Sequence, residues 1–113
     1  MISIKDTDVL AEVMYRFDPI LWDIIAFINE IEHNTVITSG HRSGDKGVHG
    51  TDPCRAVDIR SWCLLFPEKI VEAVNTHWEY DYKRPYMNCA LLHDAGSGEH
   101  IHLQVHPNTK RRT

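Results

Sequence analysis

The chain has 113 residues, of which 42% are hydrophobic and 25% are charged, and its formal net charge is -4 at pH 7. This balance excludes a disordered or fibrous chain, and the length predicts a single domain over residues 1–113 with one hydrophobic core. An acidic chain has no general basic field for holding nucleic acid, and its one basic run is the tail at residues 110–112. We expect a monomer without a nucleic-acid partner.

The start of the chain lacks the pattern of an export signal. The opening MISIKDTDVL places Lys5 and Asp6 before any apolar run of sufficient length. No stretch approaches the roughly 18 apolar residues of a membrane-spanning helix. We therefore expect synthesis in the cytoplasm and no insertion into a membrane.

The first part of the chain has helical spacing. Residues 7–16 are expected to form a short helix capped by Asp6 or Thr7, because apolar residues recur on one face. Asp18 and the proline after it match an N-cap followed by the first helical position, so a second helix is expected over residues 19–32. The wide apolar stripe of this second helix predicts that it is the main helix of the core.

The rest of the chain alternates short strands with one more helix. A proline at its start and helical spacing of apolar residues predict a helix over residues 67–77. A turn is expected at residues 94–98, between the last two strands. Helices first and strands later predict an α+β fold with a small, mainly antiparallel sheet. The expected strands are residues 35–38, 56–60, 88–93 and 100–106.

Histidine is frequent in this chain, with eight copies, and it is the commonest metal ligand. His100 and His102 stand two apart in an expected strand, so their side chains leave the same face of the sheet. Asp58 lies on a strand that can pair with this one, and His49 lies in the loop before it. A set of two histidines and one aspartate can bind zinc and leave a fourth position for water, as in hydrolytic sites. Glu99 and His100 both stand beside the last ligand and are candidates for the general base.

Several short segments of the chain resemble the LAS zinc metallopeptidases. This family contains D,D-carboxypeptidases and L-alanyl-D-glutamate endopeptidases, including phage endolysins, and its signatures are SGYRS, SxHxxGxAxDI and WIHV. The resemblance covers residues 38–60 and 99–105. The matching residues are Ser39-Gly40-His41-Arg42-Ser43, His49, Ala56-Val57-Asp58-Ile59 and Ile101-His102-Leu103.

The resemblance implies roles for individual residues. The zinc ligands of the family fall on His49, Asp58 and His102. The arginine that binds a substrate carboxylate or stabilises the oxyanion falls on Arg42, a role that suits a permanently charged group with several donors. Some relatives use a carboxylate three residues before the last ligand as the base, which matches Glu99. Others use a histidine two residues before it, which matches His100. The family pattern slightly favours Glu99, and His100 remains the alternative.

The chain also departs from the family motif. The interval from His49 to Asp58 is two residues longer than in the motif, which a loop can absorb at little cost in closure entropy. The longer loop brings Asp52 and Cys54 near the expected metal, where a cysteine thiolate would favour a closed, non-hydrolytic zinc site. We favour Cys54 as a buried thiol, because three cysteines without CxxC spacing are typical of free thiols.

Two other positions near the motifs have expected roles. His41 replaces the tyrosine of the first signature and is expected to fill an aromatic packing position rather than to bind metal. Trp62 follows the Asp58 strand closely and could line a substrate cleft.

For the whole protein, the resemblance implies a fold like that of hedgehog and D-Ala-D-Ala peptidases, and zinc-dependent hydrolysis of a peptidoglycan stem peptide. The bond cut would be D-Ala-D-Ala or L-Ala-D-Glu. A small catalytic domain without an export signal is typical of a phage or prophage lysis enzyme that is released to the cell wall. Two alternatives remain open at this point. One is a non-catalytic relative with structural zinc, and the other is a scaffold protein without metal.

Overall fold

The computed structural model describes residues 1–94, 96 and 98–113, and within them the chain forms an α+β fold. β1 pairs with β2 in parallel, and the other neighbouring strands of the larger sheet pair antiparallel. The expected α+β class with a mainly antiparallel sheet is therefore confirmed. Residues 95 and 97 of the expected turn lie outside the described residues. The five strands follow the order β1 (Ile2–Ile4), β2 (Thr35–Ser39), β3 (Ala56–Arg60), β6 (Glu99–Gln104) and β5 (Ala90–Asp94).

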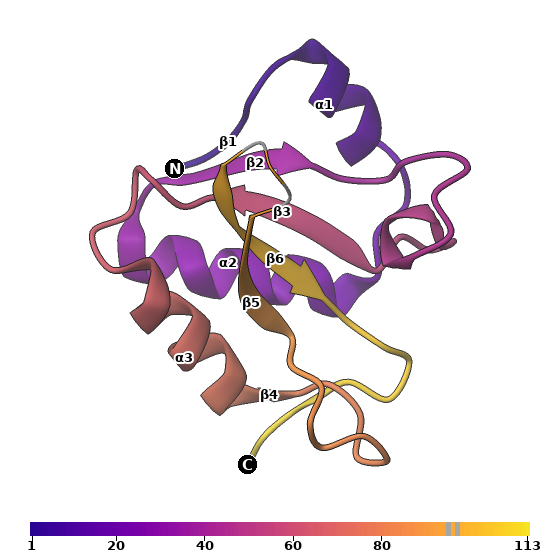
Figure 1. The fold of residues 1–113 in the computed structure, drawn as a ribbon, viewed down its shortest axis with the longest axis vertical. Helices are drawn as coiled ribbons and strands as arrows, with labels where there is room; N and C mark the ends of the chain where they lie inside the picture. The colour runs from indigo at the N-terminus through magenta and orange to yellow at the C-terminus, as the bar shows by residue number, and fades with distance from the viewer. Residues whose placement is uncertain (95, 97) are drawn as a thin grey trace.

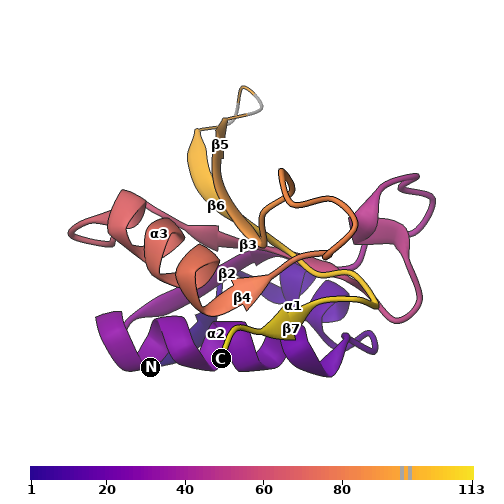
Figure 2. The same ribbon diagram turned by 90° about the horizontal axis from the view of Figure 1, so that it is seen from below.

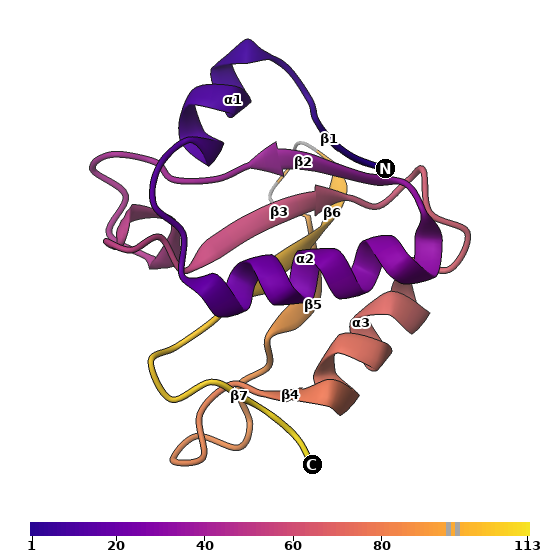
Figure 3. The same ribbon diagram turned by 180° about the vertical axis from the view of Figure 1, so that it is seen from behind.

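The helices of the described residues are α1 (Thr7–Val13), α2 (Pro19–Glu32) and α3 (Pro67–His77). α2 crosses one face of the sheet, because it lies behind the strands in Figure 1 and in front of them in Figure 3. α3 lies beside α2, and the β5–β6 hairpin projects away from both helices in Figure 2. None of these helices is both long and apolar enough to pass through a membrane.

Side-chain caps explain where the first two helices begin. The Asp6 carboxylate accepts a hydrogen bond of 2.9 Å from the amide of Val9, which confirms Asp6 rather than Thr7 as the cap. The Asp18 carboxylate accepts one of 3.0 Å from the amide of Ile20. These bonds satisfy amides that have no partner inside the helix. The observed boundaries of α2 and α3 agree with the helices expected over residues 19–32 and 67–77.

α1 is shorter than expected and ends at Val13. The chain after it pairs with a distant loop residue instead of continuing the helix. The amide of Cys54 donates to the carbonyl of Arg16 at 2.8 Å, and the amide of Asp18 donates to the carbonyl of Cys54 at 2.9 Å. These non-local bonds outweigh the local helical preference of residues 14–16.

Some strands differ from their expected boundaries. The expected strand at residues 88–93 is observed as Ala90–Asp94, and the one at residues 100–106 as Glu99–Gln104. The strand at residues 56–60 is confirmed. β1, β4 (Trp78–Glu79) and β7 (Lys110–Arg111) were not expected. Each has two or three residues, too few for an alternating pattern to show in the sequence.

The two faces of the sheet have different chemistry. Val57 and Ile59 of β3 and Ile101 and Leu103 of β6 are fully buried on the face that α2 covers. Each such side chain contributes roughly 1.5–3 kcal/mol on burial. Because side chains alternate along a strand, the residues between them point to the opposite face. That face carries the polar residues described next.

Candidate metal centre

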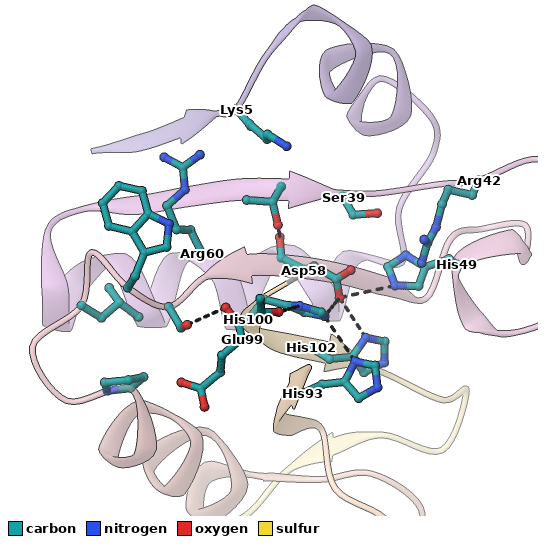
Figure 4. Close-up of a pocket in the computed structure, with 16 residues that line it drawn as sticks. Lys5, Ser39, Arg42, His49, Asp58, Arg60, His93, Glu99, His100 and His102 are labelled. Atoms are coloured by element: carbon teal, nitrogen blue, oxygen red, sulfur yellow. Dashed lines mark hydrogen bonds and ion pairs between the residues drawn. The ribbon is translucent and has the colours of Figure 1, made fainter. Parts of the chain in front are cut away.

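Three of the side chains expected to bind metal lie together on the uncovered face of the sheet (Figure 4). His102 Nδ1 is 3.0 Å from Asp58 Oδ1, and His49 Nε2 is 3.5 Å from the same oxygen. One ligand atom from each of the three residues lies within 4.8 Å of the others. The geometry forms a group that could hold a metal ion.

The fold explains why these residues meet. β3 and β6 pair antiparallel with Asp58 directly opposite His102, so both side chains leave the same face as neighbours. His49 comes from the short 3-10 helix Val48–Gly50, in the loop between β2 and β3. Sheet pairing thus provides two ligands, and the loop brings the third.

Each histidine is held by an acceptor on the side away from Asp58. His49 Nδ1 lies 2.8 Å from the carbonyl oxygen of Gly40, and His102 Nε2 lies 3.2 Å from Gln104 Oε1. Because these partners accept hydrogen bonds, the far nitrogen of each neutral ring carries the hydrogen. The nitrogen facing Asp58 then offers a lone pair. Metal-binding histidines are held in this way, so the donor set fits a divalent metal such as zinc.

The partner of His102 is itself fixed. Gln104 is buried, and its amide nitrogen donates to the carbonyl of Asn88 at 2.9 Å. The amide oxygen must therefore face His102. Gln104 was not among the residues expected at the site, although its position two residues after His102 places it on the same face of β6.

The partner of His49 is fixed by α1. The Gly40 amide donates to Glu12 Oε1 at 2.9 Å, and Ser39 Oγ donates to the same oxygen at 3.3 Å. A Cβ atom on Gly40 would lie 3.0 Å from the Glu12 carbonyl oxygen and 3.1 Å from Phe17 Cζ. The sequence gives no signal for Glu12, because this contact joins residues 28 positions apart.

Asp58 is an anion in this environment. Burial raises the pKa of its carboxyl, but when the metal-free histidines are protonated on both nitrogens, hydrogen bonds from His102 and His49 and the charge of the nearby histidines lower it more. The net result is a pKa well below the usual range. A permanently ionised oxygen ligand suits a divalent cation.

His100 and Glu99, the two candidates for the base, have different placements. His100 Nε2 lies 3.6 Å from Asp58 Oδ1 and 3.4 Å from His93 Nδ1. In Figure 4 the Glu99 carboxylate points away from Asp58. Glu99 begins β6 and lines the cleft over this group, although strand alternation directs its side chain away from that of His100. Of the two candidates, His100 is the one whose ring nitrogen lies close to Asp58.

Arg42 lies at the edge of the group, next to His49 in Figure 4. Its amide donates to the carbonyl of His49 at 2.9 Å, which ties the two residues together. Its guanidinium is about half exposed and forms an ion pair of 3.8 Å with Asp45. The side chain can therefore turn toward a ligand in the cleft.

Cys54 is a buried core thiol rather than a ligand. Its sulfur lies 3.3 Å from the carbonyl oxygen of Ala56, outside the group of metal-binding atoms. Burial raises the pKa of the thiol, which disfavours the thiolate. Asp52 forms an exposed ion pair with Arg16 instead of reaching the metal ligands.

A cleft of about 850 Å³ lies over the metal-binding group. Its walls include Arg42, Arg60, His93 and Trp62, and the place of Trp62 agrees with its expected role as a cleft residue. His41 is stacked on Tyr15 with ring centroids 3.6 Å apart, which agrees with its expected packing role. A volume of this size falls within the range of ligand-binding pockets.

We expect the Gln104→Leu substitution to weaken zinc binding by about 10- to 100-fold, because His102 loses the acceptor that fixes its orientation. The dissociation constant can be measured by competition with a chromophoric chelator. Gln104→Glu is the matched variant, since it keeps an acceptor for His102 and should lose less affinity. Equal zinc affinity in wild type and Gln104→Leu would contradict the role of this contact.

No protein-family model matches this chain, and no curated protein or solved structure matches it.

Proposed function

We propose that this protein is a zinc-dependent peptidase that hydrolyses a peptide bond in the stem peptide of peptidoglycan. The observation that carries the proposal is the group of His49, Asp58 and His102 at the base of an open cleft, at the positions where the chain resembles the LAS metallopeptidases. The resemblance further favours a hedgehog-like fold, a D-Ala-D-Ala or L-Ala-D-Glu bond as the target, and a phage or prophage lysis enzyme that acts on the cell wall after release.

A zinc ion held by His49, Asp58 and His102 would polarise a peptide carbonyl and make a water molecule more acidic. The chain must then supply a base, an oxyanion partner and a binding cleft. The cleft over these residues is where the peptide would bind.

His100 is the residue that we assign to proton transfer. Its Nε2 faces the metal-binding group, and its Nδ1 lies 3.4 Å from the carbonyl oxygen of Gly98, which can hold the ring in one orientation. In this role Nε2 accepts a proton from the attacking water and later returns it to the leaving amine.

Arg42 is the residue that we assign to substrate charge. The guanidinium can leave Asp45, to which it is bound at 3.8 Å, and donate to a carboxylate or to the developing oxyanion. Its backbone bond to His49 keeps it beside the group that would hold the metal.

The test is hydrolysis of purified peptidoglycan by the zinc-loaded protein, with the released fragments identified by mass spectrometry. We expect His100→Gln to lower the rate by about 10²- to 10⁴-fold. Glu99→Gln is the matched control and should stay within a few-fold of wild type. Absence of new peptide ends with every wall type would overturn the proposal, and a large loss in Glu99→Gln alone would move the base to Glu99.

One observation favours a second candidate, a non-catalytic protein with structural zinc. His100 Nε2 is close enough to Asp58, at 3.6 Å, to become a fourth ligand and close the site. In that case His100→Gln would weaken zinc binding strongly, and the wild type would bind zinc without hydrolysis. A catalytic His100 predicts that this substitution leaves zinc affinity almost unchanged.

A further inference from the structure

The charged residues that line the cleft are mainly basic, although the protein as a whole is acidic. The protein carries a formal net charge of -4. Lys5, Arg42 and Arg60 all line the cleft, whereas the acidic residues that line it are Asp58 and Glu99. With neutral histidines one positive charge is in excess, and a bound divalent metal would add to it. An anionic ligand would complement this charge.

Two of the three cations have no acidic partner among the residues that the structure describes. Arg42 is paired with Asp45, but neither Lys5 nor Arg60 forms an ion pair with another described residue. In Figure 4 Lys5 and Arg60 lie on one side of Asp58, and Arg42 lies on the other. The cleft therefore has a cationic end that is separate from Arg42.

Arg60 stacks on the exposed ring of Trp62 and extends from a strand in the sheet. Its guanidinium carbon lies 4.8 Å from the ring centroid of Trp62, and its backbone is fixed opposite His100 in the sheet. Stacking leaves the edge of the guanidinium free to donate two hydrogen bonds to a carboxylate. Lys5 follows β1, where its amide donates to the carbonyl of Ile37 at 3.0 Å. Both cations thus extend from backbone that the sheet fixes.

We propose that Lys5 and Arg60 form an anion-binding subsite that takes a carboxylate of the peptide substrate. The proposal rests on the peptidase function above. Arg60 follows Asp58 by two residues on the same face of β3, so it is displaced by about 7 Å along the strand. An extended peptide advances by roughly 3.3 Å per residue. The carboxylate would therefore belong to a residue about two positions from the bond that is cut.

The test measures binding of synthetic alanine-based peptides to the zinc-loaded protein by isothermal titration calorimetry. Matched peptides differ only in glutamate or glutamine at one position, and each is made with a C-terminal acid or amide. The first pair tests a side-chain carboxylate, and the second tests a chain-terminal one. We expect the preferred acid to bind about tenfold tighter than its neutral match at low salt, with the preference falling as salt rises.

The preference for the acidic peptide over its neutral match should fall to about twofold or less in Arg60→Gln. It should fall only partly in Lys5→Gln. Arg60→Lys should keep part of it, which separates loss of charge from loss of folding. Lys69→Gln removes an exposed lysine outside the cleft and is the matched control. Equal binding of acidic and neutral peptides, or a preference that survives removal of both cations, would overturn the subsite. Charge-dependent binding without hydrolysis would overturn only the peptidase function, and hydrolysis without charge preference would overturn only the subsite.

Discussion

The Asp58→Ala substitution is expected to abolish stoichiometric zinc binding and any hydrolysis that depends on it. Asp58 Oδ1 is the centre of the group, with histidine nitrogens at 3.0, 3.5 and 3.6 Å. Its loss removes the one carboxylate of the ligand set and leaves several imidazoles that repel one another when protonated. We expect the zinc content after gel filtration to fall from about one per chain to near zero, and the affinity to fall by more than 100-fold.

Thermal unfolding gives an independent measure of the same change. Zinc at about 100 times its dissociation constant should stabilise the wild type by roughly 2.7 kcal/mol, because it binds the folded chain. For a domain of this size that corresponds to a rise of about 10 °C in Tm. Asp58→Ala should show almost no rise. Asp52→Ala is the matched control, since Asp52 only forms a surface pair with Arg16. Tight zinc binding by Asp58→Ala would contradict the assignment of the site.

The Gly50→Ala substitution is expected to damage the loop that carries His49, although Gly50 binds no ligand. A Cβ atom at this position would lie 1.9 Å from the carbonyl oxygen of Asp45 and 2.8 Å from its carbonyl carbon. These are backbone atoms, so the loop must move rather than one side chain. We expect a loss of about 3 kcal/mol in the free energy of unfolding, a fall of about 10 °C in Tm, and weaker zinc binding.

Gly47→Ala provides the control in the same loop. Its added Cβ atom would meet only the end of the Asp45 side chain, at 3.2 Å, and that side chain can shift. We expect a loss below about 1 kcal/mol, with zinc affinity close to wild type. Circular dichroism melting curves and chelator competition on both variants make the comparison. If Gly50→Ala and Gly47→Ala lower the stability and the zinc affinity equally, the close approach of Gly50 to the Asp45 backbone is not what keeps this loop in shape.

The proximity of His49, Asp58 and His102 could be predicted because its signals are local or periodic. Strand alternation placed His100 and His102 on one face, and the motif spacing identified Asp58 and His49. The same alternation places Glu99 on the opposite face, which the family pattern alone did not take into account.

Other parts of the structure depend on contacts that leave no local signal. β1 is paired only with β2, and its three residues, Ile-Ser-Ile, are too few to mark a strand in the sequence. Glu12 supports Gly40 across 28 residues of sequence, and α1 stops early because the chain after it bonds to Cys54. Each of these features is decided by a distant partner, so a reading along the chain cannot reveal it.

The ligand positions also have a consequence for protein synthesis. His49 and Asp58 are made early, but Asp58 meets His102 across 44 residues of sequence. At roughly 5–20 residues per second, a ribosome needs about 2 to 9 s to add that interval. During this time the nascent chain has two of the three ligands and no β6 to pair with β3. A metal ion held by all three residues could therefore bind only after β6 has emerged and paired with β3.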